Sequence, residues 1–293
     1  HSYAQLVHHL PAERTIVTCH DIDTFRCLLE PEREPRSKLF VAMTRKIFDG
    51  LRKAARVTCD SHATRDDLLK YEVIPPERLS VIYNGVHPTC SAEPDALADE
   101  KAARLLGAAQ AGGIDLLHVG STIARKRIDV LLSVFAAVKK EFSQARLLRA
   151  GGAFTREQLK LVEQLGLAKS IVVLPSLSRP VLAAVYRRAT LVLQPSEREG
   201  FGLPVIEAMA CGAPVVASDL PVLREVGGEA SVYCPVADVK TWTASVNELL
   251  SGRSMQPELW AARRAAGLAQ SSLFSWSEYA RRMVCLYQEL CAS

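Results

Sequence analysis

The stretch "TLVLQPSEREGFGLPVIEAMACGAPVVASDL", residues 190–220, decides the fold of this chain. It opens with a short apolar run, passes through a glycine loop into a helical pattern, and closes with a second apolar run. Pro204 suits the first position of that helix, because its missing N–H would have no intrahelical partner there. Two buried strands joined by a helix predict a parallel sheet with helices on both faces.

The same alternation runs through the chain from residue 114 onward. Helical spacing of apolar residues recurs in residues 127–142, 155–166 and 179–189, between the apolar runs. Six runs read as buried strands: "IDLLHVG" (114–120), "ARLLRAG" (145–151), "SIVVLPS" (170–176), "TLVLQPS" (190–196), "PVVASDL" (214–220) and "SVYCPV" (231–236). This segment is therefore predicted to be a doubly wound α/β domain.

The first 85 residues contain fewer strand candidates, at 14–19, 55–60 and 79–84. A doubly wound domain usually has about six strands, so we expect roughly the first half of an N-terminal domain to be absent from this sequence. The Asn-Gly turn in "NGVHP", residues 84–88, marks a hinge. We expect three segments: a partial N-terminal domain (1–85), a C-terminal domain (86–272) and a closing helix (273–293) that begins at a Ser N-cap and packs back toward the N-terminal domain.

Composition narrows the class of protein. The 36 Lys and Arg residues against 32 Asp and Glu residues give a net charge of +4, too small and dispersed for nucleic acid to be the main partner. The eight cysteines form no C-x-x-C pair and have no histidine at metal-ligand spacing, which favours a reduced, cytoplasmic compartment and no metal. No run reaches the length of a membrane span.

The glycine loop is the predicted ligand site, because ligands of open parallel sheets bind at the carboxyl ends of strands. Taken alone, Gly200 and Gly202 are turn residues, but bare backbone also lets a ligand approach closely. The N–H groups of Phe201, Gly202 and Leu203, with the helix dipole, form an anion seat.

Two carboxylates flank this seat. Glu199 and Glu207 are poor direct ligands for a phosphate, so we expect them to accept hydrogen bonds from hydroxyls. A sugar nucleotide offers a diphosphate between two hydroxyl-rich rings. One glutamate would face the transferred sugar and the other the ribose diol. The alternative is a solvated loop acid and a helix-start acid favoured by the dipole.

The stretch resembles the retaining glycosyltransferases of family 4, whose E-x7-E signature is met by Glu199 and Glu207. The resemblance extends through "HVGSTIARKRIDVLL", "IYNGVH" and "SWSEYARRMVCLYQEL", and covers residues 15–290. It implies the GT-B fold: two Rossmann-like, doubly wound domains facing a cleft, the N-terminal one incomplete here. The C-terminal domain of that fold holds the nucleotide sugar.

Site residues follow from the resemblance by position. Gly120 and Ser121 lie in the stretch similar to the phosphate-binding loop, and Lys126 matches the diphosphate lysine, with Arg125 beside it. Two cations there would neutralise a leaving diphosphate; a solvated helix start is the alternative. Arg127 departs from the Gly or Asn usual in the family, which puts its role in doubt.

On the acceptor side, "TCHDIDTF", residues 18–25, is similar to the family's His-Asp segment. His20 would contact the transferred sugar or the acceptor, or be structural at its strand end. Asp21 and Asp23 form a D-x-D pattern that binds metal in another glycosyltransferase fold; here we expect them to be structural, capping the helix that follows.

The implied reaction is a metal-independent hexosyl transfer with retention, in which the diphosphate departs and the acceptor hydroxyl attacks from the same face. The donor is a nucleotide sugar, GDP-mannose as first expectation or a UDP-hexose, with no further cofactor. The acceptor is a glycan or a lipid-linked glycan. The alternatives are a donor-binding fragment without turnover and a nucleotide-sugar epimerase on the same fold.

A basic, apolar stretch, residues 35–57, leaves membrane contact open. It fits a helix on an anionic bilayer at the inner face of the membrane, where a lipid-linked acceptor waits. It fits better a solvated helix packed on its own sheet.

Overall fold

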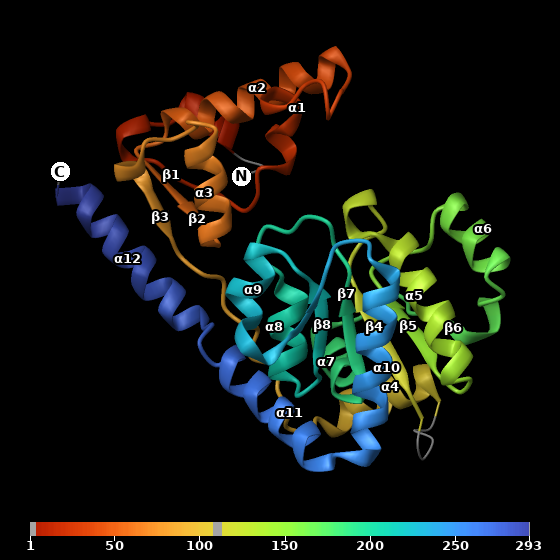
Figure 1. The fold of residues 1–293 in the computed structure, drawn as a ribbon. Coiled ribbons are helices and arrows are strands. Elements are labelled where there is room, and N and C mark those ends of the chain that lie inside the picture. Colours follow the sequence, from red (N-terminus) through yellow and green to blue (C-terminus); the bar gives the residue numbers. More distant parts are fainter. Residues whose placement is uncertain (1–3, 108–112, 293) are drawn as a thin grey trace. The chain divides into compact units, whose positions relative to one another are not determined.

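The computed structural model describes residues 4–107 and 113–292, and Figure 1 shows the fold. Its contacts divide the chain into two units. The N-terminal unit comprises the residues up to Gly85, the short segment Glu199–Phe201 and the residues from Ser275 onward. The C-terminal unit comprises Val86–Arg198 and Gly202–Phe274. The two glutamates of the E-x7-E stretch thus belong to different units.

A six-stranded, all-parallel sheet forms the centre of the C-terminal unit, with the order β6-β5-β4-β7-β8-β9. The strands are β4 (Asp115–Val119), β5 (Arg146–Ala150), β6 (Ile171–Val173), β7 (Leu191–Gln194), β8 (Val215–Ser218) and β9 (Val232–Cys234). All six predicted runs are therefore strands. The direction of winding reverses between β4 and β7, as expected of a doubly wound sheet.

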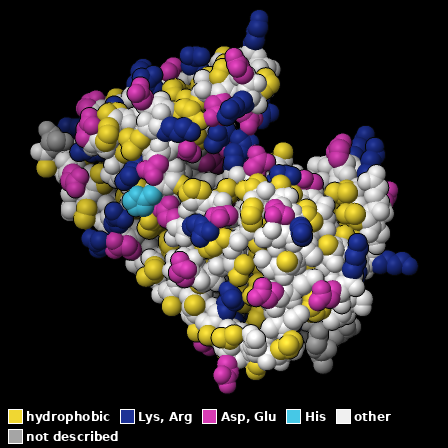
Figure 2. All heavy atoms as spheres, in the orientation of Figure 1, with side chains coloured by type: hydrophobic (Ala, Val, Ile, Leu, Met, Phe, Trp, Pro, Cys, Tyr) yellow, Lys and Arg dark blue, Asp and Glu magenta, His cyan; other side chains and the backbone are white. Residues whose placement is uncertain are grey.

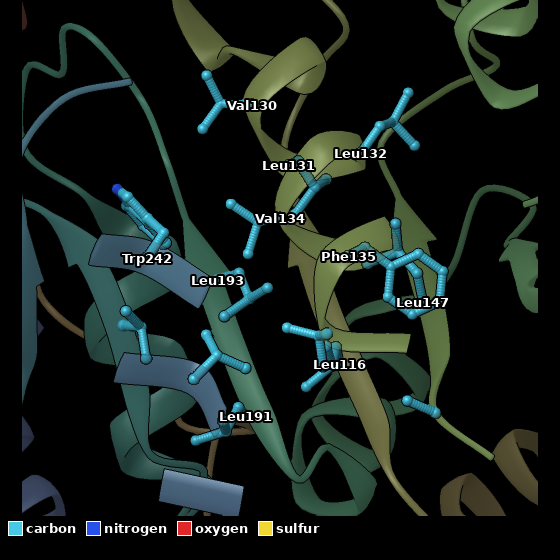
Figure 3. Packing of buried hydrophobic residues seen from close by; sticks show 14 of the residues in the cluster. Leu116, Val130, Leu131, Leu132, Val134, Phe135, Leu147, Leu191, Leu193 and Trp242 are labelled. Atoms are coloured by element: carbon cyan, nitrogen blue, oxygen red, sulfur yellow. The ribbon is translucent and has the colours of Figure 1, made fainter. Parts of the chain in front are cut away.

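Helices cover both faces of this sheet. They are α4 (Ala96–Leu106), α5 (Ile128–Glu141), α6 (Arg156–Gln164), α7 (Arg179–Arg188), α8 (Leu203–Ala210), α9 (Pro221–Gly227), α10 (Val239–Met255) and α11 (Pro257–Ser271), with 3-10 turns η5 (Ala124–Lys126), η6 (Ala168–Ser170) and η7 (Gly228–Ala230). On one face, Leu116 and Leu193 of the strands pack with Leu131 and Phe135 of α5 and Trp242 of α10 (Figure 3). Helices α7, α8 and α9 pack on the other.

The N-terminal unit has a three-stranded parallel sheet in the order β1-β2-β3. Its elements are β1 (Ile16–Cys19), β2 (Arg56–Cys59), β3 (Leu79–Val81), α1 (Arg26–Leu29), α2 (Lys38–Lys53), α3 (His62–Lys70) and α12 (Trp276–Ala292), with η1 (Ala4–His9), η2 (Ala12–Arg14), η3 (Asp23–Phe25) and η4 (Pro76–Arg78). The three strand predictions are confirmed.

Helix α12 packs within the N-terminal unit, where its Met283 and Leu286 form a small buried cluster with Ile82. The Ser275 hydroxyl accepts the N–H of Glu278 at 3.1 Å. The predicted Ser cap is therefore confirmed. Within the described residues, no helix combines the length and hydropathy that crossing a bilayer requires.

One local prediction was wrong. Helix α8 begins at Leu203, one residue earlier than expected, so Pro204 occupies the second position; its missing N–H is still harmless in the first turn. Asp21 and Asp23 both make local side-chain hydrogen bonds. Asp21 Oδ1 accepts the N–H of Asp23, the first residue of η3, at 3.1 Å, and Asp23 Oδ1 accepts Arg26 Nε at 3.2 Å.

Candidate functional site

The reversal of winding between β4 and β7 marks the expected ligand site of the C-terminal unit. Strands β4 and β7 are neighbours, yet α5 follows β4 onto one face while α8 follows β7 onto the other. The two connecting loops therefore part at the carboxyl edge of the sheet. In doubly wound folds ligands bind where such loops diverge.

The loop after β4 carries Gly120, Ser121, Arg125 and Lys126. Lys126 is only 8% exposed, and a Cβ atom on Gly120 would lie 3.7 Å from the Cδ and Cε atoms of the lysine. The aliphatic stem of Lys126 thus crosses the bare backbone of Gly120, while Ser121 is exposed. The structure brings together the glycine and the lysine that the sequence singled out.

Arg125 joins this loop to the loop after β7. Its Nη1 donates to the carbonyl of Arg198 at 2.9 Å, and its own carbonyl accepts the N–H of Glu197 at 2.8 Å. Arg125 therefore has a structural function within the C-terminal unit, whatever else it binds.

The backbone at Arg127 explains why Gly or Asn is usual at this position. Its φ of 47° lies in the left-handed region, which Gly and Asn adopt most readily. The Arg127 guanidinium contacts Asp129 at 2.8 Å and Glu197 at 3.6 Å. Its hydrogen bond with Asp129 holds the pKa of that carboxyl below its ordinary value. The side chain is therefore engaged in ion pairs at the start of α5.

Glu207 lies in α8 and is half-buried. Tyr186 of α7, which is fully buried, donates its hydroxyl to Glu207 Oε2 at 3.1 Å. Burial raises the pKa of Glu207 above its ordinary value, although the Tyr186 hydrogen bond and the charge of Arg179 oppose the shift. The carboxylate is thus oriented by a tyrosine that the sequence analysis did not identify.

Backbone conformation requires glycine at position 202, and close packing requires it at position 200. Gly202 has a φ of 97° and precedes α8. A Cβ on Gly200 would lie 2.2 Å from the carbonyl oxygen of His20, within the N-terminal unit. Both glycines therefore satisfy packing and backbone geometry, and close approach of a ligand is not needed to explain them.

The segment Glu199–Phe201 is fixed by α3 of the N-terminal unit. The carbonyl of Gly200 accepts hydrogen bonds from the hydroxyls of Ser61, at 2.8 Å, and Thr64, at 3.3 Å. The Phe201 ring lies 6.1 Å from that of Tyr83. The backbone next to Glu199 is thereby held in one conformation.

His20 and Asp60 meet because they follow neighbouring strands. Cys19 of β1 pairs with Cys59 of β2, so the next residue of each strand leaves the sheet at the same edge. His20 Nδ1 lies 2.5 Å from Asp60 Oδ2, and the aspartate is buried while the histidine is exposed. A buried carboxylate on Nδ1 fixes the ring orientation and favours the tautomer with its proton on that nitrogen.

Sequence reasoning also missed two buried polar residues, His118 in β4 and Arg149 in β5. The available signal was a polar residue inside an otherwise apolar strand. Among the residues that the structure describes, no group of three or more His, Cys, Asp or Glu side chains has the arrangement of a metal site.

Comparison with known protein families identifies the family of this chain. Residues 107–265 match the model of "Glycosyl transferases group 1", and residues 1–89 match that of "Glycosyltransferase Family 4". The chain belongs to the family 4 glycosyltransferases. The recognition made from the E-x7-E stretch is confirmed.

Two family 4 relatives share 28% and 32% sequence identity with this chain. The D-inositol 3-phosphate glycosyltransferase of Thermobispora bispora is 32% identical over 248 residues, which are 80% of this chain and 56% of the relative. The O-antigen chain mannosyltransferase B of Escherichia coli is 28% identical over 286 residues, 95% of this chain and 71% of the relative. The chain thus spans little more than half the length of the first of these relatives.

Solved structures show the fold. Anabaena Alr3699/HepE, solved in complex with UDP and glucose, superimposes with a TM-score of 0.74 at 19% identity, covering 92% of this chain and 70% of that one. The predicted GT-B class, with two parallel α/β sheets of which the N-terminal one is small, is therefore confirmed.

Proposed function

We propose that this family 4 glycosyltransferase moves a hexose from a nucleoside diphosphate sugar to a glycan or a lipid-linked acceptor, with retention of configuration. One observation carries the proposal. Lys126 and Glu207 follow neighbouring strands, β4 and β7, at the carboxyl edge where the winding of the sheet reverses. A cation and a hydroxyl acceptor at that edge suit the diphosphate and ribose of a donor.

The proposed roles in the C-terminal unit follow the chemistry of the donor. Lys126 neutralises the leaving diphosphate, because negative charge grows as the glycosidic bond breaks. Glu207, held by Tyr186, accepts hydrogen bonds from the ribose diol. Arg125 adds positive charge while it holds the two loops together. The dipole of α8 favours an anion at its start, as at any helix N-terminus.

Glu199 and His20 are proposed to contact the transferred sugar or the acceptor. The hydrogen bonds that hold Gly200 fix the backbone beside Glu199, and Asp60 fixes the ring of His20. Fixed geometry of this kind is what a site for a sugar in its transition state requires. We propose that the departing phosphate accepts the proton of the acceptor hydroxyl, which then attacks from the same face without a metal ion.

Mannose is our proposed hexose. A relative whose name specifies mannosyl transfer aligns over 95% of this chain, and guanosine diphosphate is the corresponding leaving group. A structural relative holds UDP and glucose, so a UDP-hexose is the alternative donor. Because the chain covers only 56% of the first relative, we keep a second candidate function, donor binding without turnover.

Helix α2 is the proposed contact with an acceptor-bearing membrane. It exposes Leu39 and Met43, at 73% and 60%. Lys and Arg side chains lie among hydrophobic ones over the α1–α2 part of this unit (Figure 2). Apolar groups flanked by basic ones bind anionic lipid surfaces.

The test is calorimetric titration of the 293-residue chain with GDP, UDP and ADP, followed by assay of sugar release from the matching sugar nucleotide. We expect saturable binding of one nucleotide, weakened about tenfold or more in Lys126→Ala. Lys140→Ala is the matched control, because Lys140 is exposed at the far end of α5. Binding without sugar release would favour the donor-binding candidate, and no binding to any nucleotide would reject the donor function.

A further inference from the structure

His118 and Arg149 form a buried polar pair at the carboxyl edge of the six-stranded sheet. They are partners in the parallel register of β4 and β5, and neither has any exposed surface. Partners in register point to the same face of a sheet. Two residues earlier the same register pairs Leu116 with Leu147, in the core beneath α5. The pair therefore continues that core to the sheet edge, next to the start of α5.

The hydrogen-bonding capacity of this pair is largely unused. Arg149 Nη1 donates to the carbonyl of Ala150, but Nε and Nη2 have no hydrogen-bond partner. Neither ring nitrogen of His118 has one. A buried guanidinium with two nitrogens that donate no hydrogen bond is costly for a ligand-free fold. In native proteins such groups are rare and call for an explanation, and a bound ion is one of the explanations.

The local charge is positive. Burial alone lowers the pKa of Arg149, to about 10. Burial and the charges of Arg149 and Lys126 lower the pKa of His118. Among the described residues, no carboxylate contributes to either shift. The positive charge at this edge therefore favours an anion as the partner of the unused N–H groups.

Backbone contacts place the guanidinium beside Gly120. The Ala150 carbonyl that accepts Arg149 Nη1 also accepts the N–H of Gly120, at 2.9 Å. A Cβ atom on Gly120 would lie 3.3 Å from His118 Cε1 and 3.7 Å from two carbons of Lys126. Arg149, His118 and Lys126 thus surround one bare stretch of backbone, the loop assigned above to the donor diphosphate.

We propose that Arg149 binds the diphosphate of the nucleotide-sugar donor through its Nε and Nη2 groups. These two N–H groups form the side-on fork that matches two oxygens of a phosphate. Gly120 follows β4, and Gly151 and Gly152 follow β5, at the same edge of the sheet. These residues lack side chains and change torsion readily. The inference rests on the proposed donor function. It adds the Arg149 guanidinium of β5 to the residues that bind the diphosphate.

The experiment compares wild type with Arg149→Met and Arg149→Lys in the full 293-residue chain. The probes are pyrophosphate, GDP with guanosine, and UDP with uridine. We expect Arg149→Met to weaken binding of pyrophosphate and of the preferred nucleoside diphosphate about tenfold or more, with unchanged affinity for the nucleoside. Arg149→Lys keeps the charge but loses the fork, so its loss should be smaller. Arg156→Met is the matched control, because Arg156 is exposed in the same unit.

Thermal unfolding separates this role from a structural one. Without ligand, Arg149→Met should unfold at the same or a higher temperature than wild type, because a buried charge without a partner has been removed. A lower unfolding temperature with a parallel loss of nucleoside affinity would indicate a structural arginine and overturn the proposal. Unchanged pyrophosphate and nucleotide affinities would also overturn it, and would leave the donor function intact if Lys126→Ala still weakens binding. If wild type binds none of the probes, the donor function itself fails.

Discussion

His20 Nδ1 lies 2.5 Å from Asp60 Oδ2, so an exposed imidazole is held by a buried carboxylate. The contact joins the ends of two adjacent strands, β1 and β2, and both residues belong to the N-terminal unit. A carboxylate on one ring nitrogen fixes which nitrogen carries the proton. With the proton on Nδ1, the other ring nitrogen, Nε2, is a hydrogen-bond acceptor.

Asp60→Asn should therefore impair sugar release from the donor about tenfold or more, with unchanged affinity for the nucleoside diphosphate. The amide can donate to Nδ1 and so favours the opposite tautomer, as orienting groups of catalytic histidines do when altered. The nitrogen chemical shifts of the His20 ring would report the tautomer directly. Asp66→Asn, an exposed change on α3, serves as control, and equal turnover in both variants would contradict this role.

The sequence could predict the strands because their signal is local. Each of the strands β4 to β9 is a contiguous apolar run that can be recognised without the rest of the chain. The glycine loop is also one contiguous stretch of sequence. Contacts between distant residues carry no such signal. Asp60 lies 40 positions from His20, and Tyr186 lies 21 positions from Glu207. Their meeting depends on strand order and helix packing, which only the folded chain determines.

His118 and Arg149 can each be recognised in the sequence, but their pairing cannot. Each is visible in the sequence as a polar residue in an apolar strand, where burial without a partner is costly. Whether the two polar residues meet depends on the register between β4 and β5. Sequence periodicity predicts the strands but does not specify that register.

Gly200→Ala should destabilise the N-terminal unit by about 1–3 kcal/mol, because overpacking against rigid neighbours costs that much. The added Cβ would lie 2.2 Å from the His20 carbonyl oxygen, a backbone atom that cannot rotate away. Thermal unfolding, with hydrogen exchange of the β1 amides, measures the effect. Gly252→Ala in α10 has open space around it and should stabilise by about 0.5–1 kcal/mol. Equal stability of Gly200→Ala and wild type would show that the contact is not maintained in solution.

Glu207→Gln should make the chain more stable at neutral pH while weakening its affinity for the nucleoside diphosphate. Burial raises the pKa of Glu207, so the folded chain binds more protons than the unfolded chain between the ordinary carboxyl pKa and the raised value. Stability therefore falls as pH rises through this window, and glutamine removes the fall. Denaturant unfolding at several pH values from 4 to about 8 tests the sign. A wild-type contribution that grew with pH would contradict the burial effect.

Replacing Leu39 and Met43 of α2 by glutamate should abolish binding to vesicles that contain phosphatidylglycerol. These side chains are exposed beside Lys38, Arg45 and Lys46, and carboxylates there would be repelled by an anionic surface. Flotation of wild type with phosphatidylglycerol vesicles, but not with pure phosphatidylcholine vesicles, is the expected reference.

The matched control for that experiment changes Met255 and Leu259 to glutamate, because both are exposed, at 76% and 64%, in the C-terminal unit. This variant should float like wild type, since Met255 and Leu259 belong to α10 and α11 and lie outside the helix proposed to contact the membrane. Nucleotide affinity should be unchanged in both double variants, because the proposed donor residues Lys126 and Glu207 are intact. If wild type fails to float, or if both double variants lose flotation equally, α2 is not a membrane-binding helix and the acceptor must reach the enzyme by another route.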